Sequence, residues 1–236
     1  MQPNVADLEE FYRSATGRAV QAMIARRLEA LWPDLGGLDI LALGYGIPYF
    51  SASESTPRRL ALAMPARQGV EQWPASGGVK SLLVDDQALP FNEASFDRVL
   101  IIHGLEESRA PAELLMEVHR ILSPQGRVVS VVPNRSGLWA HRDASPFGHG
   151  RAFSRGQMRA LMRECGLQTC AWAKALYAPP TRFITSLSAV RAWEQAGERL
   201  WPAFGGVIMV EASKQVLVRP PTARPLLIPA LGNLKS

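Results

Sequence analysis

Residues 38–50 read LDILALGYGIPYF, and this stretch decides the fold. The apolar run from Leu38 to Leu43 predicts a buried strand, and Gly44 and Gly46 predict a sharp turn that lies close to a ligand. Glycines lack the Cβ atoms that would block such an approach, and a helix starting next would direct its free N–H groups to the same place. The pattern also occurs in strand-to-helix turns that bind nothing, so both interpretations stay open.

Composition indicates a globular chain. It has 236 residues, 47% of them hydrophobic, which is enough for one large core. No apolar run approaches the roughly 20 residues of a membrane span, and the first residues lack the order of a secretion signal. We therefore expect a cytoplasmic protein without a membrane span. Cys165 and Cys170 lack the spacing of metal ligands, and no metal site is predicted.

Patterning divides the chain into three parts. Residues 1–33 are predicted to form a helical segment that ends at Trp32-Pro33. Residues 34–218 form the main domain, with an insertion at 178–204 whose pattern is harder to recognise. Residues 219–236 contain Pro and no acid, which predicts an extended or disordered tail.

Apolar and alternating runs predict about seven strands, at 38–43, 59–64, 79–84, 96–103, 127–132, 167–176 and 207–218. Helices are expected at 7–31, 51–55, 110–122, 154–165 and 183–200, and the first of them could be broken near Gly17. Strand and helix alternate along the first five strands, which predicts a sheet covered on both faces. The expected fold class is α/β, a three-layer Rossmann-like sheet, mostly parallel with an antiparallel last strand.

Four residues end predicted strands on the side where such sheets bind ligands. They are Gly44, Met64, Asp85 and His103. Because the carboxyl ends of parallel strands meet at one edge, we expect these residues to line one rim. Asp85 with Asp86 could also be a strand-end cap and turn, and His103 a buried histidine whose hydrogen bonds are satisfied within the core.

The net charge of +5 is carried mainly by arginine. Residues 119–163 hold eight arginines against a single acid, Asp143. This segment could face an anionic substrate or nucleic acid, or it could be a solvated basic surface. It lacks the aromatic-interleaved basic motif of RNA modules, so RNA is the less favoured partner.

Three motifs, in order, resemble those of class I S-adenosylmethionine-dependent methyltransferases, in the subgroup that mostly methylates small molecules. The motifs are Asp85-x-x-x-Leu89-Pro90-Phe91, Phe96-Asp97 and Glu117-Val118-x-Arg120-Ile121-Leu122-x-Pro124-x-Gly126. The resemblance covers roughly Leu38 to Val132. It implies the Rossmann-like fold, S-adenosylmethionine as the cofactor and methyl transfer as the reaction.

The resemblance also assigns cofactor contacts. Gly44, Tyr45 and Gly46 would lie against the methionine part of the cofactor. Asp85 would accept a hydrogen bond from the adenine amino group, with Asp86 beside it.

Catalytic candidates follow from the reaction. Methyl transfer from a sulfonium is an in-line displacement, so the protein must chiefly align the reactants and exclude water. His103 would lie near the reactive methyl, and His103, His141 or His149 could serve as a base. Tyr12, on the N-terminal helix, could close over the site.

The chain departs from the family's pattern at several cofactor positions. Ala42 replaces the acid that usually begins the glycine loop, and Pro48 replaces its last glycine. The carboxylate that binds the ribose hydroxyls is replaced by Met64 or Pro65, so Glu71 or a backbone carbonyl would have to substitute. These exchanges support an alternative, a protein that has lost catalysis and acts as a binding or regulatory partner.

The acceptor itself cannot be identified from these patterns. A small or anionic molecule is the expected acceptor, and a protein partner is a further option. Nicotinamide dinucleotide binding is a third interpretation, weakened by Tyr49, which stands where that fingerprint has its third glycine.

Overall fold

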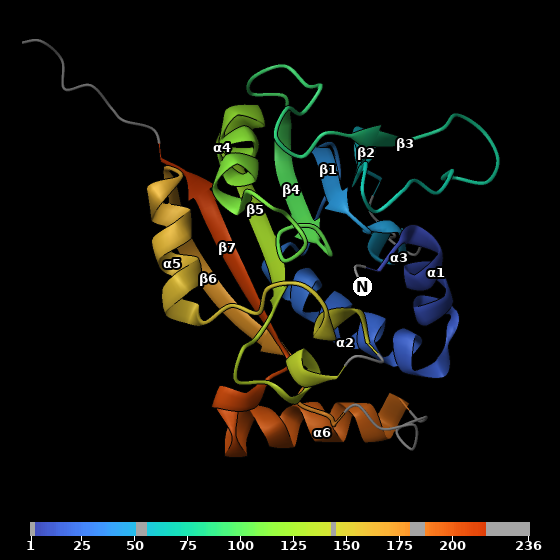
Figure 1. Cartoon of the computed structure of the whole chain (residues 1–236), viewed down its shortest axis with the longest axis vertical. Helices are drawn as coiled ribbons and strands as arrows, with labels where there is room; N and C mark the ends of the chain where they lie inside the picture. The colour runs from blue at the N-terminus through green and yellow to red at the C-terminus, as the bar shows by residue number, and fades with distance from the viewer. Residues whose placement is uncertain (1–2, 51–55, 143–144, 180–186, 216–236) are drawn as a thin grey trace, which may run out of the picture.

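A computed structural model describes residues 3–50, 56–142, 145–179 and 187–215 (Figure 1). Its seven-stranded sheet has the order β3-β2-β1-β4-β5-β7-β6. The strands are β1 Asp39–Gly44, β2 Arg59–Pro65, β3 Ser81–Val84, β4 Phe96–Ile102, β5 Leu122–Pro133, β6 Leu167–Ala175 and β7 Val207–Lys214.

Strand directions agree with the sequence prediction. The first five strands pair in parallel, β1 with β2 and β4, β2 with β3, and β4 with β5. The last strand, β7, is antiparallel to both β5 and β6. The mostly parallel sheet with an antiparallel last strand is therefore confirmed.

Helices cover both faces of this sheet. They are α1 Val5–Arg13, α2 Ala15–Leu31, α3 Ile47–Phe50, α4 Pro111–Ile121, α5 Arg155–Glu164 and α6 Leu187–Leu200. Side chains of α1 and α2 share one apolar core with one face of the sheet. Side chains of α4 and α5 share a second core with the opposite face. The three-layer arrangement follows from these two cores, each of which buries one apolar sheet face.

The N-terminal helix predicted at 7–31 is broken close to Gly17, an option that the sequence left open, into the helices α1 and α2. Asn4 caps α1, and the Ser14 hydroxyl accepts the N–H of Gly17 where α2 begins. A Cβ on Gly17 would lie 1.9 Å from the Phe11 carbonyl oxygen, so the two helices meet too closely for any other residue. Because the chain turns at Ser14, α1 and α2 do not form one continuous helix. Tyr12, on α1, packs in the apolar core on one face of the sheet.

Two other expectations need adjustment. The turn predicted at 123–126 belongs to β5, which begins at Leu122 because that residue pairs with Phe96 of β4. The crossover helix expected at 51–55 lies outside the described residues, as does the tail at 219–236. The short helix α3 instead follows the glycine turn directly.

No helix in the described ranges is both long enough and apolar enough to cross a lipid bilayer.

Candidate functional site

The carboxyl ends of β1 to β4 meet at one edge of the sheet. Gly44 at the end of β1 pairs with Ile102 of β4, and Pro65 at the end of β2 pairs with Val84 of β3. The rim expected from the strand ends is therefore present (Figure 1).

The glycine turn is shaped by its contact with β4. Gly44 has φ +92°, and a Cβ there would lie 2.1 Å from the Ile102 carbonyl oxygen. The Tyr45 N–H donates to that same oxygen at 2.9 Å. A Cβ on Gly46 would lie 2.5 Å from the Ala42 Cβ. Both glycines are thus required by the chain's own close packing, whatever else the turn binds.

Tyr45 fills the space beside this turn. It is 2% exposed, its ring stacks on Tyr12 with centroids 5.8 Å apart, and its hydroxyl donates to Glu71 at 2.7 Å. Burial, and then the Glu71 hydrogen bond, raises the pKa of Tyr45. The Glu71 N–H in turn approaches the sulfur of Met64, at 3.4 Å. Met64 is fully buried, so its side chain forms part of the core behind the rim.

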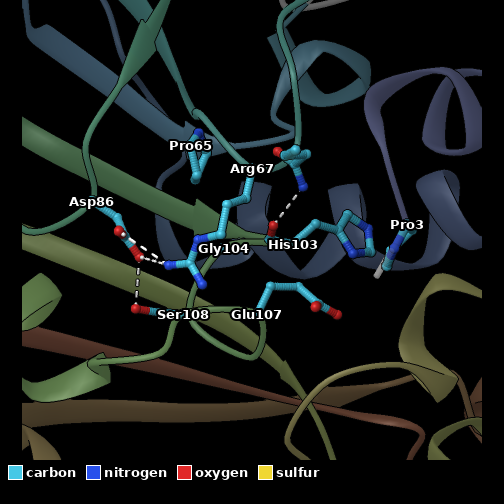
Figure 2. A pocket seen from close by; sticks show the side chains of 9 residues that line it. Pro3, Pro65, Arg67, Asp86, His103, Gly104, Glu107 and Ser108 are labelled. Atoms are coloured by element: carbon cyan, nitrogen blue, oxygen red, sulfur yellow. Dashed lines mark hydrogen bonds and ion pairs between the residues drawn. The ribbon is translucent and has the colours of Figure 1, made fainter. Parts of the chain in front are cut away.

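A cavity opens between the ends of β2, β3 and β4 (Figure 2). Its enclosed volume is about 20 Å³, room for about one water molecule, so the cavity as it stands is smaller than a typical ligand pocket. Its lining residues are Pro3, Pro65, Arg67, Gln68, Asp86, His103, Gly104, Glu107 and Ser108. Of the predicted cofactor-binding residues, Asp86 is the one that lines this cavity.

The two adjacent aspartates have different surroundings. Asp86 is 6% exposed and accepts a hydrogen bond from the Ser108 hydroxyl at 2.7 Å and an ion-pair contact from Arg67 at 3.3 Å (Figure 2). Asp85 is exposed, and its carboxylate accepts the N–H of Gln87 at 2.9 Å. Asp85 therefore closes a turn, while Asp86 presents its carboxylate to the cavity.

Gln68 lies in the segment after β2, at the rim, and is held there through both its side chain and its backbone. The side-chain amide of Gln68 donates to the His103 carbonyl at 2.8 Å, and its backbone carbonyl accepts the Val5 N–H at 2.8 Å. The Gln68 Oε1 atom is buried and has no hydrogen-bond partner among the described residues. Gln68 thus links the start of α1 to the end of β4, while its neighbour Arg67 pairs with Asp86 after β3.

His103 and Tyr12 are in direct contact, although the sequence separates them widely. The His103 Nε2 atom lies 2.8 Å from the Tyr12 hydroxyl, which lies 2.9 Å from the Tyr49 hydroxyl. His103 is 1% exposed, and its ring packs against Phe147. Burial, followed by the charge and hydrogen bond of Tyr49, raises the pKa of Tyr12 well above its ordinary value. Tyr12 therefore keeps its proton, and its hydroxyl can donate to the His103 Nε2 atom or accept from it, depending on the imidazole tautomer.

Sequence reasoning missed Glu106, which lies beside His103. Its Oε1 atom is 3.5 Å from the His103 Nδ1 atom, and both side chains are buried. Neither carboxylate oxygen of Glu106 has a hydrogen-bond partner within the described part of the chain. An acid three residues after a strand-ending histidine is the signal that could have found it.

The other predicted histidines lie elsewhere. His149 follows the short helix Pro146–Gly148, on the loop where Gly150 packs against the Glu106 carbonyl. His141 is exposed, and its ring lies 3.2 Å from the Arg135 carbonyl oxygen. The structure thus brings together His103 and Tyr12 and leaves these two rings outside that cluster.

Half of the eight arginines in residues 119–163 bind within the chain. Arg120 pairs with Glu117 and donates to two backbone carbonyls, and Arg127 pairs with Glu211. The guanidinium groups of Arg155 and Arg159 lie over the Trp172 ring. The charge of this segment therefore serves the fold at these positions. Across the described residues, no cluster of three or more His, Cys, Asp or Glu side chains could hold a metal ion.

Comparison with known proteins agrees with this geometry. Residues 52–130 match the family model of a methyltransferase domain. A demethylmenaquinone methyltransferase of Lactococcus lactis is 31% identical over 121 residues, which are 47% of this chain and 48% of that relative. The chain thus spans about half the length of the curated relative it matches.

Solved structures share the fold. The protein bound to the Trm112 methyltransferase activator of Haloferax volcanii has a TM-score of 0.63 at 18% identity, over 88% of this chain and 97% of that one. A geranyl diphosphate C-methyltransferase of Streptomyces coelicolor, solved with S-adenosyl-L-homocysteine, has a TM-score of 0.56 at 15% identity, over 82% of this chain and 77% of that one. Residues 52–130 are thus similar to a methyltransferase domain, and the chain as a whole shares the fold of solved methyltransferases.

Proposed function

We propose that this chain transfers a methyl group from S-adenosylmethionine to a small acceptor. The observation that carries the proposal is the cavity at the ends of β2, β3 and β4, which has both Asp86 and His103 in its wall. Ligands of open α/β sheets bind at this edge. When bound, the cofactor supplies a methyl group on a sulfonium, so the chain needs to align the acceptor and exclude water.

The cavity wall suits part of an adenosyl group. The Asp86 carboxylate and the Ser108 hydroxyl would hold polar groups of the adenosine, and Gln68 Oε1 is a buried acceptor that lacks a described partner. Tyr45 and Glu71 occupy the place beside the glycine turn. We therefore propose that the Tyr45–Glu71 contact opens when the methionine part enters.

Residues around His103 would form the acceptor side. The buried rings of Tyr12 and Phe147 surround the imidazole and would exclude water from the reacting atoms. His149 lies on the loop that touches Glu106 and would be a second candidate at the edge of this site.

A small acceptor is favoured by the relatives. The Lactococcus relative is named for demethylmenaquinone, and the Streptomyces structure contains geranyl diphosphate. Both are small organic molecules. The Haloferax structure is a complex with an activator protein, which supports a protein partner as an additional feature rather than as the acceptor.

Calorimetry with S-adenosylhomocysteine tests the proposal on the full chain. Asp86→Asn should weaken binding about 10-fold or more, because it removes a buried charge-assisted acceptor. Asp85→Asn is the matched control, since this neighbouring carboxylate is exposed, and its affinity should stay within about 2-fold.

Two results would reject the proposal. One is the absence of binding by S-adenosylmethionine and S-adenosylhomocysteine at about 1 mM. The other is an effect of Asp85→Asn as large as that of Asp86→Asn. In the first case, a binding or regulatory role without methyl transfer becomes the better hypothesis.

A further inference from the structure

Glu106 is a buried carboxylate to which no described group donates a hydrogen bond. The residue is 3% exposed, and neither oxygen has a partner in the described part of the chain. Burying an unpaired polar group is costly, and burying an unpaired charge is more so. The His103 Nδ1 atom, which can carry a proton, lies 3.5 Å from the Glu106 Oε1 atom. The position therefore has a stability cost that a function would have to justify.

The opposite side of the imidazole has a defined partner. The Tyr12 hydroxyl lies 2.8 Å from Nε2 of His103, and the raised pKa of Tyr12 keeps that hydroxyl protonated. A neutral imidazole has one N–H donor and one acceptor nitrogen. A carboxylate at Nδ1 and a phenol at Nε2 are both satisfied only when the proton is on Nδ1.

The backbone holds this pair in place from both sides. His103 has φ +53°, an uncommon conformation for a residue other than glycine, and the Gln68 amide donates to its carbonyl. The Glu106 carbonyl accepts the N–H of Arg151 at 2.8 Å. Fixed backbone at both residues is the arrangement that preorganised sites require.

We infer that Glu106 is a positioning residue for His103. It holds the imidazole proton on Nδ1, so that the lone pair of Nε2 is directed to the site and can accept a proton. The inference rests on the proposed methyl transfer and adds to it the identity of the proton acceptor. Without a bound substrate, the Tyr12 hydroxyl lies against Nε2 of His103. A hydroxyl of the methyl acceptor would displace it when that molecule binds.

The proton step balances as follows for an acceptor that carries a hydroxyl. The acceptor oxygen forms a bond to the methyl carbon of the cofactor, and the carbon–sulfur bond breaks with its electron pair passing to sulfur. The hydroxyl proton passes to Nε2 of His103. The imidazolium that results lies against the Glu106 carboxylate, which compensates its charge.

The direct test is the tautomer of His103 in the wild-type chain. The four histidines are labelled with ¹⁵N, and His103→Gln identifies the resonances of His103. Spectra at alkaline pH, where imidazoles are neutral, distinguish a protonated Nδ1 from a protonated Nε2. A protonated Nδ1 is expected. A protonated Nε2 would overturn the inference, whether or not any variant folds.

Two substitutions then assign the tautomer to Glu106. Glu106→Leu removes the acceptor, and the His103 resonances should shift to a mixture of both tautomers. Glu106→Gln retains a carbonyl oxygen and should restore the Nδ1 tautomer. Glu113→Leu, an exposed glutamate on α4, controls for the loss of one negative charge and should change nothing at His103. An unchanged tautomer in folded Glu106→Leu would contradict the role.

The same samples separate this inference from the proposed function. S-adenosylhomocysteine binding is measured by calorimetry on each variant, and Glu106→Leu should bind it within about 2-fold of wild type. Binding together with a protonated Nε2 rejects the role of Glu106 alone. A protonated Nδ1 in a chain that binds no cofactor rejects the methyl transfer and leaves the pairing of Glu106 with His103.

Discussion

Two buried glutamates in different regions of the molecule differ in the number of hydrogen bonds that they accept. Glu194 on α6 accepts the backbone N–H groups of Leu176, Tyr177 and Ala178, at the end of β6. Glu106, after β4, accepts none within the described residues. Both are almost completely buried. The difference indicates that Glu194 holds two elements together, whereas Glu106 makes no such link, which agrees with the positioning role that we infer for it.

Glu211 on β7 is intermediate between them. It is 4% exposed and accepts the indole N–H of Trp32 at 3.0 Å and a guanidinium contact from Arg127 at 3.1 Å. The three glutamates therefore form a series in the number of donors that each carboxylate satisfies. Substitution of Glu by Gln keeps the side-chain volume at each position. The change in the free energy of unfolding then reports how much the charge and the second acceptor oxygen contribute to stability.

Glu194→Gln should have the largest effect on stability. A glutamine places an NH₂ group against a backbone N–H that an oxygen of Glu194 accepts whether or not the acid is protonated, so at least one buried donor loses its partner. We expect the free energy of unfolding to fall by about 2–3 kcal/mol near about pH 5, measured by urea denaturation. A loss below about 0.5 kcal/mol would show that the three hydrogen bonds do not hold α6 to β6.

Glu211→Gln should have a smaller effect. The amide oxygen can still accept the Trp32 indole N–H, and the ion pair that is lost involves a half-exposed Arg127. We expect a loss of about 1 kcal/mol in the same assay. Glu113→Gln on the exposed face of α4 is the control and should leave the unfolding free energy unchanged.

The fold could be predicted from the sequence because each central strand is a short apolar run that ends at a turn residue. The limits of that approach are local. β5 begins before its predicted turn because Leu122 pairs with Phe96, a tertiary contact that no local pattern encodes. Gly17 indicated that the N-terminal helix could break nearby, but the close approach of Gly17 to Phe11 that accompanies the break at Ser14 is a tertiary contact that the apolar spacing does not show.

The site was less predictable, for reasons that concern side-chain direction. Neighbouring residues at a strand end point to opposite sides, so the sequence could not show that Asp86 rather than Asp85 enters the cavity. The contact of Tyr12 with His103 joins residues 91 positions apart. Glu106 stands close to His103 in the chain, but its lack of donors is a property of the packed structure alone.

The pH dependence of stability sharpens the comparison at Glu194. Burial raises the pKa of Glu194, and the hydrogen bonds from Tyr177 and Ala178 oppose this only in part. The folded chain therefore keeps this proton to a higher pH than the unfolded chain does. The contribution of Glu194 to the free energy of unfolding is therefore complete below its pKa in the unfolded chain, about 4.3. This contribution is lost as the pH rises through its pKa in the folded chain.

This sign can be checked by difference. The unfolding free energy of wild type minus that of Glu194→Gln should decrease as the pH rises from about 4 to 7. Glu113→Gln is measured beside it as the control, since this glutamate is exposed on α4. A difference that increases with pH would mean that the backbone donors, and not burial, dominate at Glu194.

Glu106→Gln should have the smallest effect on stability. The substitution keeps the side-chain volume and removes a buried charge to which no described group donates. Removing the desolvation cost of that charge should offset the weaker contact with His103. We expect the unfolding free energy to stay within about 0.5 kcal/mol of wild type, or to rise slightly. A loss of about 2 kcal/mol, like that expected for Glu194→Gln, would show that Glu106 supports the fold as Glu194 does. The contrast between a structural carboxylate and one that serves the rim would then no longer hold.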